Sequence, residues 1–243
     1  FVRKLISSLP LLLTGTPPKL KAFIDSLHGE YTNLANKKVY KGEEVNGQRL
    51  EQTFALGLQQ AMGYKKYRRT ELVKLSRMLN IKVCPYCNHN FTLYIDLLDK
   101  TKMKGLFQFD HFYDMSDYPY LSMSLYNLIP SCSLCNHQKS TAKLDLRYNP
   151  YFKGISDEFH FKVVDSFELR SGKMGADKIG IKIERNASGQ GIDELQESLH
   201  LEEQYSRHKD IVQEIYDKAY SETYYRNMLT IMPDVEREKL LNQ

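Results

Sequence analysis

The chain has little cysteine: its 243 residues include four, and all four fall in two Cys-x-x-Cys pairs. The sequence also lacks internal repeats, low-complexity tracts and apolar runs long enough to span a bilayer. A secreted protein of this length more often scatters its cysteines for long-range disulfides. We therefore expect a cytoplasmic protein with no membrane partner, in which the paired cysteines bind a metal.

The net charge of +4 is small, but the basic residues are unevenly placed. They gather before the first cysteine pair, where only Glu71 opposes them, and resume after it: Lys65, Lys66, Arg68, Arg69, Lys74, Arg77 and Lys82, then Lys100, Lys102 and Lys104. A basic flank beside a metal site suits a nucleic-acid phosphate backbone, although a solvated helix face gives the same pattern. The residues that we expect to contact nucleic acid are Lys65, Lys66, Arg68 and Arg69.

Hydrophobic spacing predicts an α+β fold with four consecutive regions. These are a helical N-terminal region, a core of short strands and a helix, a β-rich extension and a helical C-terminal region: residues 1–80, 81–145, 146–190 and 191–243. Alternating residues at 158–184 predict a hairpin whose turn contains Gly172 and Gly175. Apolar residues at four-three spacing predict one long amphipathic helix over 201–219.

Three helices are expected in the N-terminal region, each with an apolar face in the core. The first follows Pro17, the second spans Gln48 to Met62 after a turn-like stretch at 37–47, and the third follows Thr70. The expected core faces of the first and third are Leu20, Phe23, Ile24 and Leu27, and Leu72, Leu75, Met78 and Leu79. In the core region, strands are expected at 81–83, 91–95, 106–109 and 127–130, and a helix from Cys135.

The two cysteine pairs, Cys84 with Cys87 and Cys132 with Cys135, have the spacing of zinc knuckles. Four thiolates fill the tetrahedral coordination of one Zn²⁺, so this metal would be structural and would clamp two segments together. An iron–sulfur cluster and a redox dithiol are the alternatives. A redox role does not need two pairs, and the spacing favours structural zinc.

Several polar residues recur between and after these pairs in a defined order. The chain reads Cys-x-x-Cys, then Asp-His, then Asn-Leu, then Cys-x-x-Cys-Asn-x-x-Lys; besides the cysteines, the residues are Asp110, His111, Asn127, Leu128, Asn136 and Lys139. In this order and spacing the sequence resembles the HNH endonucleases, a family of ββα-metal nucleases, over residues 81–145. The resemblance implies a zinc-stapled ββα-metal core that hydrolyses phosphodiester bonds.

The chemistry of these residues suits that reaction. A neutral imidazole at His111 can take a proton from water, and Asp110 and Asn136 offer the oxygen ligands that Mg²⁺ prefers. The resemblance implies that these two residues hold Mg²⁺ or Mn²⁺ against the scissile phosphate, and that Asn127 braces the loop carrying His111. Lys139 would contact a phosphate as a point charge.

Two positions leave alternatives open. His137 directly follows Asn136 and is the alternative ligand of the catalytic metal, which would then favour softer ions such as Mn²⁺, Ni²⁺ or Zn²⁺. Many family members have proline three residues after the histidine, where this chain has Asp114, which puts the shape of that loop in doubt.

The segment around Asp110, from Phe109 to Ser122, is similar to an HNH subgroup found beside ATPases in Septu-type and retron-linked anti-phage systems. This similarity implies a nuclease subunit of a bacterial defence system with an ATPase partner. We expect DNA as the substrate rather than RNA, although a basic flank would track the phosphates of either polymer. The alternatives are a non-catalytic zinc-knuckle module that binds nucleic acid or protein, and an accessory subunit of an ATPase complex that uses the fold as a scaffold.

Overall fold

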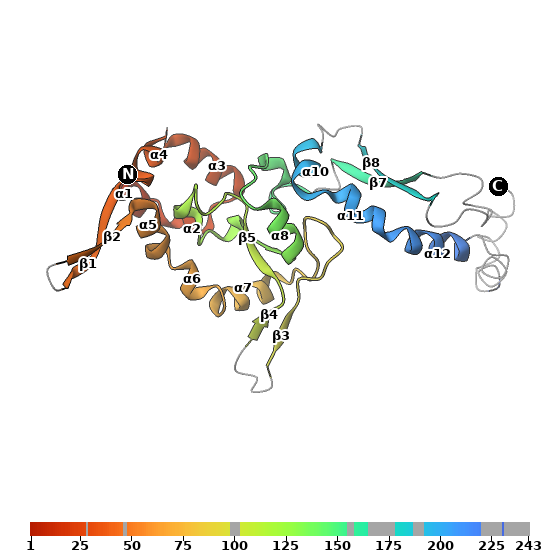
Figure 1. The fold of residues 1–243 in the computed structure, drawn as a ribbon, viewed down its shortest axis with the longest axis horizontal. Helices are drawn as coiled ribbons and strands as arrows, with labels where there is room; N and C mark the ends of the chain where they lie inside the picture. Colours follow the sequence, from red (N-terminus) through yellow and green to blue (C-terminus); the bar gives the residue numbers. More distant parts are fainter. Residues whose placement is uncertain are drawn as a thin grey trace. The chain divides into compact units, whose positions relative to one another are not determined.

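The computed structural model describes residues 1–27, 29–45, 48–97, 103–154, 158–164, 178–186, 192–219 and 230, with the backbone alone at 41–45 and 48–50. The chain forms two compact units. The first contains residues 1–157 and 193–199, and the second contains 158–192 and 200–243. The described residues form helices and two-stranded antiparallel sheets (Figure 1), which confirms the α+β class. No helix among them is long and apolar enough to cross a membrane.

The first unit begins with four short helices, α1 (Val2–Ser7), α2 (Leu9–Thr14), α3 (Pro17–Ser26) and α4 (Glu30–Ala35). Leu20, Phe23 and Leu27 are buried, as the helical spacing predicted. They pack with Tyr120 and Leu121, which lie about 100 residues later in the chain, in one apolar cluster. This cluster ties the N-terminal helices to the segment that follows His111.

The stretch after α4 is a β-hairpin, β1 (Lys38–Val45) with β2 (Gln48–Thr53). The sequence prediction of a turn at 37–47 and a helix from Gln48 was therefore wrong. Helix α5 (Phe54–Met62) begins after Thr53, whose hydroxyl accepts a hydrogen bond from the Leu56 amide at 3.2 Å. It ends at Gly63, whose φ of 79° lies in the left-handed region that favours glycine.

Two basic helices follow, α6 (Tyr64–Tyr67) and α7 (Glu71–Leu79). Leu72 is buried as predicted, but Met78 is 82% exposed, so its assignment to the core was wrong. Val73 and Ser76 are buried instead, which rotates the inner face of α7 away from Met78.

The remaining strands and helices of this unit surround the cysteine pairs. They are β3 (Tyr94–Asp96) paired with β4 (Met103–Gly105), β5 (Gln108–His111) paired with β6 (Leu128–Ser131), and helices α8 (Ser133–Lys139) and α10 (Asp193–Leu199). Single 3₁₀ turns lie at Pro119–Leu121, Leu125–Asn127 and Leu146–Tyr148. The strand expected at 81–83 is reduced to one bridge, between Val83 and Phe91.

The second unit is a hairpin packed on helices. Strands β7 (Phe159–Val164) and β8 (Gly180–Arg185) pair antiparallel, which confirms the predicted hairpin; Gly172 and Gly175 lie outside the described residues. The predicted long helix is divided into α11 (Leu201–Tyr205), a 3₁₀ turn (Ser206–His208) and α12 (Lys209–Ala219). The rings of Phe161 and Tyr205 stack at 3.7 Å between centroids and join the hairpin to the helices.

Candidate functional site

The four cysteines converge on one point. The sulfurs of Cys84, Cys87, Cys132 and Cys135 all lie within 4.8 Å of one another, and all four residues are buried. A regular tetrahedron with Zn–S bonds of about 2.3 Å has sulfurs about 3.8 Å apart, so the spacing is close to what one ion requires. This cluster can hold a metal ion such as zinc.

Local hydrogen bonds shape the first cysteine pair into a tight turn. The Cys84 amide donates to the Asn90 carbonyl and the Asn88 amide to the Cys84 carbonyl, each at 2.8 Å. Asn88 has a φ of 48°, in the left-handed region that asparagine tolerates. The Asn90 side-chain amide lies 3.8 Å from the Cys87 sulfur and 3.6 Å from the Cys132 sulfur, so it contacts both pairs.

The second pair lies at the start of α8. Cys132 caps this helix, since its sulfur accepts a hydrogen bond from the Cys135 amide at 3.4 Å. Hydrogen bonding with Cys135 and Cys84 lowers the pKa of Cys87, whereas hydrogen bonding with Cys84 and Cys87 raises the pKa of Cys135. A metal ion binds cysteine as the thiolate, so binding a cation at this cluster would release the thiol protons.

The strand pair β5–β6 and helix α8 bring three predicted site residues to one groove. Asp110 and His111 end β5, and Asn136 lies on α8, which contacts β5. All three line a groove of about 1240 Å³. His137 also lines this groove and is exposed.

His111 is held as a neutral imidazole. It is 9% exposed, and its Nε2 lies 3.1 Å from the Ser122 carbonyl oxygen. A carbonyl only accepts hydrogen bonds, so Nε2 carries the proton and Nδ1 keeps its lone pair. The Tyr64 ring packs edge-on against the imidazole at 4.5 Å between centroids. Burial lowers the pKa of His111 below 6.5, which keeps it unprotonated at neutral pH.

Asp110 is buried, 3% exposed, with two partners in the protein. The Tyr86 hydroxyl donates to its Oδ2 at 2.7 Å, and the Lys139 ammonium lies 3.2 Å from Oδ1 and 3.1 Å from Oδ2. Lys139 also donates to the His111 carbonyl at 2.9 Å and is 1% exposed. The expectation that Lys139 contacts a phosphate does not fit this geometry, because its ammonium faces the interior and pairs with Asp110.

Asn136 and Asn127 are each fixed by their side-chain amides. The Asn136 amide group donates to Gln108 Oε1 at 2.5 Å, which leaves the Asn136 oxygen directed away from Gln108. Asn127 is fully buried; its oxygen accepts from the Tyr113 amide at 2.7 Å, and its Nδ2 donates to the Tyr113 and Leu121 carbonyls at 3.1 Å. These bonds span the loop after His111, which is the geometry that a bracing role requires.

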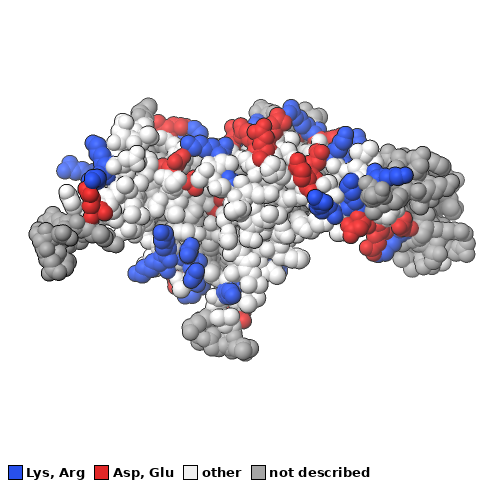
Figure 2. All heavy atoms as spheres, viewed as in Figure 1, with Lys and Arg blue, Asp and Glu red and all other residues white. Residues whose placement is uncertain are grey.

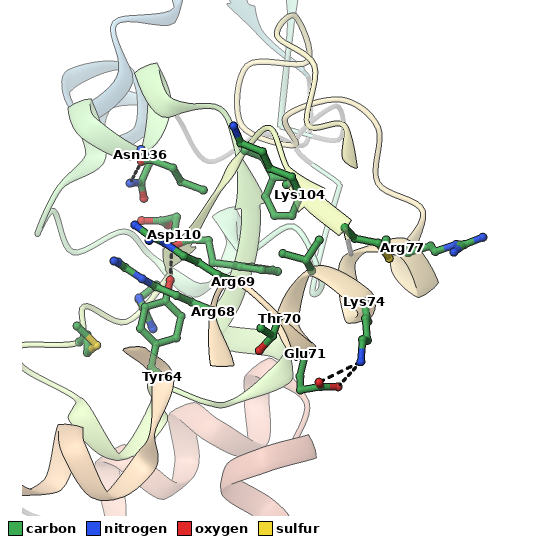
Figure 3. Close-up of a pocket in the computed structure, with 18 of the residues that line it drawn as sticks. Tyr64, Arg68, Arg69, Thr70, Glu71, Lys74, Arg77, Lys104, Asp110 and Asn136 are labelled. Carbon is green, nitrogen blue, oxygen red and sulfur yellow. Dashed lines mark hydrogen bonds and ion pairs between the residues drawn. The ribbon is translucent and has the colours of Figure 1, made fainter. Parts of the chain in front are cut away.

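The basic residues divide into two groups. Figure 2 shows Lys and Arg gathered over α6 and α7. Arg68 and Arg69 line the groove and, in Figure 3, point toward the side that carries Asp110 and Asn136. The other groove cations are Lys74, Arg77 and Lys104, of which Lys74 pairs with Glu71 at 3.0 Å.

Lys65 and Lys66 do not line this groove. They line a separate cavity of about 250 Å³ that shares Tyr64 and Met115 with it. Lys100 and Lys102 lie outside the described residues.

Sequence reasoning missed two aromatic residues of the site, Tyr64 and Tyr86. Tyr86 lies between two predicted metal ligands, and Tyr64 directly follows the glycine that ends α5. Both positions were visible in the sequence, but an aromatic residue there is equally typical of core packing. Comparison of the chain with protein-family models, curated proteins and solved structures finds no match. The site is therefore interpreted from its own geometry.

Proposed function

We propose that this protein is a metal-dependent HNH endonuclease that hydrolyses phosphodiester bonds of nucleic acid, with DNA the expected substrate. The observation that carries the proposal is the content of one groove. The groove is lined by the neutral imidazole of His111, which has a lone pair on Nδ1, and by the Asp110 carboxylate. It is also lined by the Asn136 amide and by two arginines, Arg68 and Arg69. The groove is large enough and basic enough to admit a sugar–phosphate backbone.

His111 would act as the general base. Its Nδ1 takes a proton from a water molecule as the water oxygen attacks phosphorus, and the bond to the leaving 3′ oxygen breaks. The lowered pKa of His111 keeps the base in its active form at neutral pH. Arg68 and Arg69 hold the phosphate backbone across the groove, and Asn127 fixes the loop after His111.

The donor set fits a hard divalent cation. The Asp110 carboxylate has about four acceptor sites and three protein contacts, which leaves a lone pair for a cation, and Asn136 presents an amide oxygen. Mg²⁺ or Mn²⁺ bound there would supply charge neutralisation at the scissile phosphate and the leaving oxygen. His137 is the alternative ligand from α8.

We assign the cysteine cluster to structural Zn²⁺. The support is the close approach of four sulfurs, since an iron–sulfur cluster would place several ions between them and separate them further. The zinc would fix the first cysteine pair against the start of α8. Because α8 carries Asn136, this clamp would hold the active-site groove in shape.

The test compares two histidine variants on plasmid DNA and on RNA, with zinc-loaded protein and added Mg²⁺ or Mn²⁺. We expect His111→Ala to reduce cleavage by at least about 100-fold and to retain substrate binding, since general-base catalysis contributes that much. His160→Ala, an exposed histidine of the second unit, is the matched control and should cleave like the wild type. Equal cleavage by both variants, or a wild type inert on both polymers with either metal, would contradict the proposal.

The resemblance noted in the sequence extends the proposal to a biological setting. We infer a cytoplasmic nuclease subunit of a bacterial anti-phage system that acts with an ATPase partner. Co-purification with the product of a neighbouring ATPase gene, and cleavage that depends on that partner, would test it. A protein that cleaves at full rate alone and binds no such ATPase would exclude it.

A further inference from the structure

Tyr86 joins the cysteine cluster to the active-site carboxylate. It lies in the first cysteine pair, between Cys84 and Cys87, and is 2% exposed. Its hydroxyl donates to Asp110 Oδ2 at 2.7 Å, a short distance typical of a hydrogen bond to an ionised acceptor. The Tyr86 hydroxyl therefore links the first cysteine pair directly to the Asp110 side chain.

A second donor reaches the same carboxylate from the segment that contains the other cysteine pair. Lys139 lies four residues after Cys135 on α8 and contacts both Asp110 oxygens, at 3.2 and 3.1 Å. Asp110 is thus held between two side chains, and each comes from a segment that contains two of the four cysteines. Asp110 lines the groove, whereas neither Tyr86 nor Lys139 is among the residues that line it.

We propose that Tyr86 is a positioning residue that orients Asp110 for the catalytic cation, so that the zinc centre and the cleavage site are coupled through one hydrogen bond. This proposal rests on the proposed nuclease function. Lys139 lies close to both Asp110 oxygens, whereas Tyr86 donates to Oδ2. The Tyr86 bond is therefore the contact that distinguishes the two oxygens and restricts rotation of the carboxylate.

A merely structural role predicts something different. A buried tyrosine hydroxyl needs a partner, and Asp110 supplies one whether or not it binds a cation. Removal of the hydroxyl would then change stability and leave cation affinity untouched. A positioning role predicts instead that cation affinity falls while the protein stays folded and loaded with zinc.

The experiment compares Tyr86→Phe with Tyr151→Phe. Tyr151 is the matched control because its hydroxyl donates to the Leu128 carbonyl at 3.0 Å and does not contact Asp110. Four quantities are measured for each: zinc content, melting temperature, Mn²⁺ affinity from the electron paramagnetic resonance signal of the free ion, and cleavage rate against Mn²⁺ concentration. The binding measurement needs no turnover.

We expect Tyr86→Phe to keep one zinc per chain and to bind Mn²⁺ about 10- to 100-fold more weakly, as loss of an outer partner of a metal ligand does. Its cleavage should recover in part at high Mn²⁺, and Tyr151→Phe should match the wild type. Wild-type Mn²⁺ affinity and cleavage in Tyr86→Phe would overturn the positioning role and leave the nuclease proposal standing. A wild type that neither binds Mn²⁺ nor cleaves would overturn both.

Discussion

Replacing Lys139 with methionine separates two roles for this residue, and the buried geometry predicts the outcome. The ammonium lies within 3.2 Å of both Asp110 oxygens and donates to the His111 carbonyl at 2.9 Å, with the side chain fully buried. Methionine keeps much of the side-chain volume but removes the charge. The Asp110 carboxylate would then be a buried anion whose remaining partner is Tyr86.

The expected loss of stability is large. Removing one partner of a buried ion pair costs about 3–5 kcal/mol, because the other charge stays buried without compensation. For a chain of this size each kcal/mol lowers the melting temperature by about 2–4 °C, so Lys139→Met should melt about 6–20 °C below the wild type. The assay is thermal unfolding of the zinc-loaded protein in low-salt buffer without nucleic acid. Urea unfolding provides a second measure of stability.

Two further variants check the reasoning. Lys74→Met removes an exposed ion pair with Glu71 and should change the unfolding free energy by at most about 1 kcal/mol. The double variant Lys139→Met with Asp110→Asn removes both buried charges and should recover most of the lost stability while remaining inactive. Lys139→Met could instead have the melting temperature of the wild type and a salt slope of substrate binding that is smaller by about one. In that case the lysine contacts a phosphate and our interpretation is wrong.

The other predictions concern the metal, the base and the basic groove. Cys132→Ser should lose zinc and unfold at lower temperature, measured by metal analysis and melting; a variant that keeps both would exclude the cysteine cluster as the zinc site. The acidic limb of the cleavage-rate profile should have its midpoint below about pH 6.5, because burial lowers the pKa of His111 and the neutral form persists to lower pH. A midpoint above that value would contradict His111 as the base. Joint replacement of Arg68 and Arg69 by alanine should reduce the salt slope of substrate binding by about two, and the two lysines of α6 should matter less.

The site was more predictable from the sequence than the surrounding fold. Two Cys-x-x-Cys pairs predict that four sulfurs meet around one metal ion, because each pair is a local motif of metal sites. The four cysteines do lie together. The segments around Asp110 and Asn136 were placed on a strand and a helix, and both residues line one groove. These predictions depended on short spacings, which change little with long-range packing.

The errors arose where long-range pairing or burial decided the structure. Leu50 lies at the same helical spacing as the apolar residues of α5, so residues 48–53 were predicted to be part of that helix. They instead form a strand that pairs with 38–45 as a hairpin. Strand pairing depends on a partner segment that a helical pattern does not reveal. Lys139 is another case, because lysine is rarely buried, and its burial here depends on the Asp110 carboxylate and the His111 carbonyl, which are partners the sequence does not reveal.

The loop after His111 is held by local hydrogen bonds and lacks the proline that the resemblance to HNH endonucleases predicts there. Asp114 stands where proline is common, but its carboxylate accepts hydrogen bonds from the Ser116 amide at 2.8 Å and from the Ser116 hydroxyl. These bonds form a local turn at Asp114, and the Asn127 side chain binds the Tyr113 backbone in the same loop. Asp114 also lines the groove, where its charge raises the pKa of His111 against the larger effect of burial. Asp114 therefore fixes the start of the loop, while burial still lowers the pKa of His111, and both features suit the proposed base.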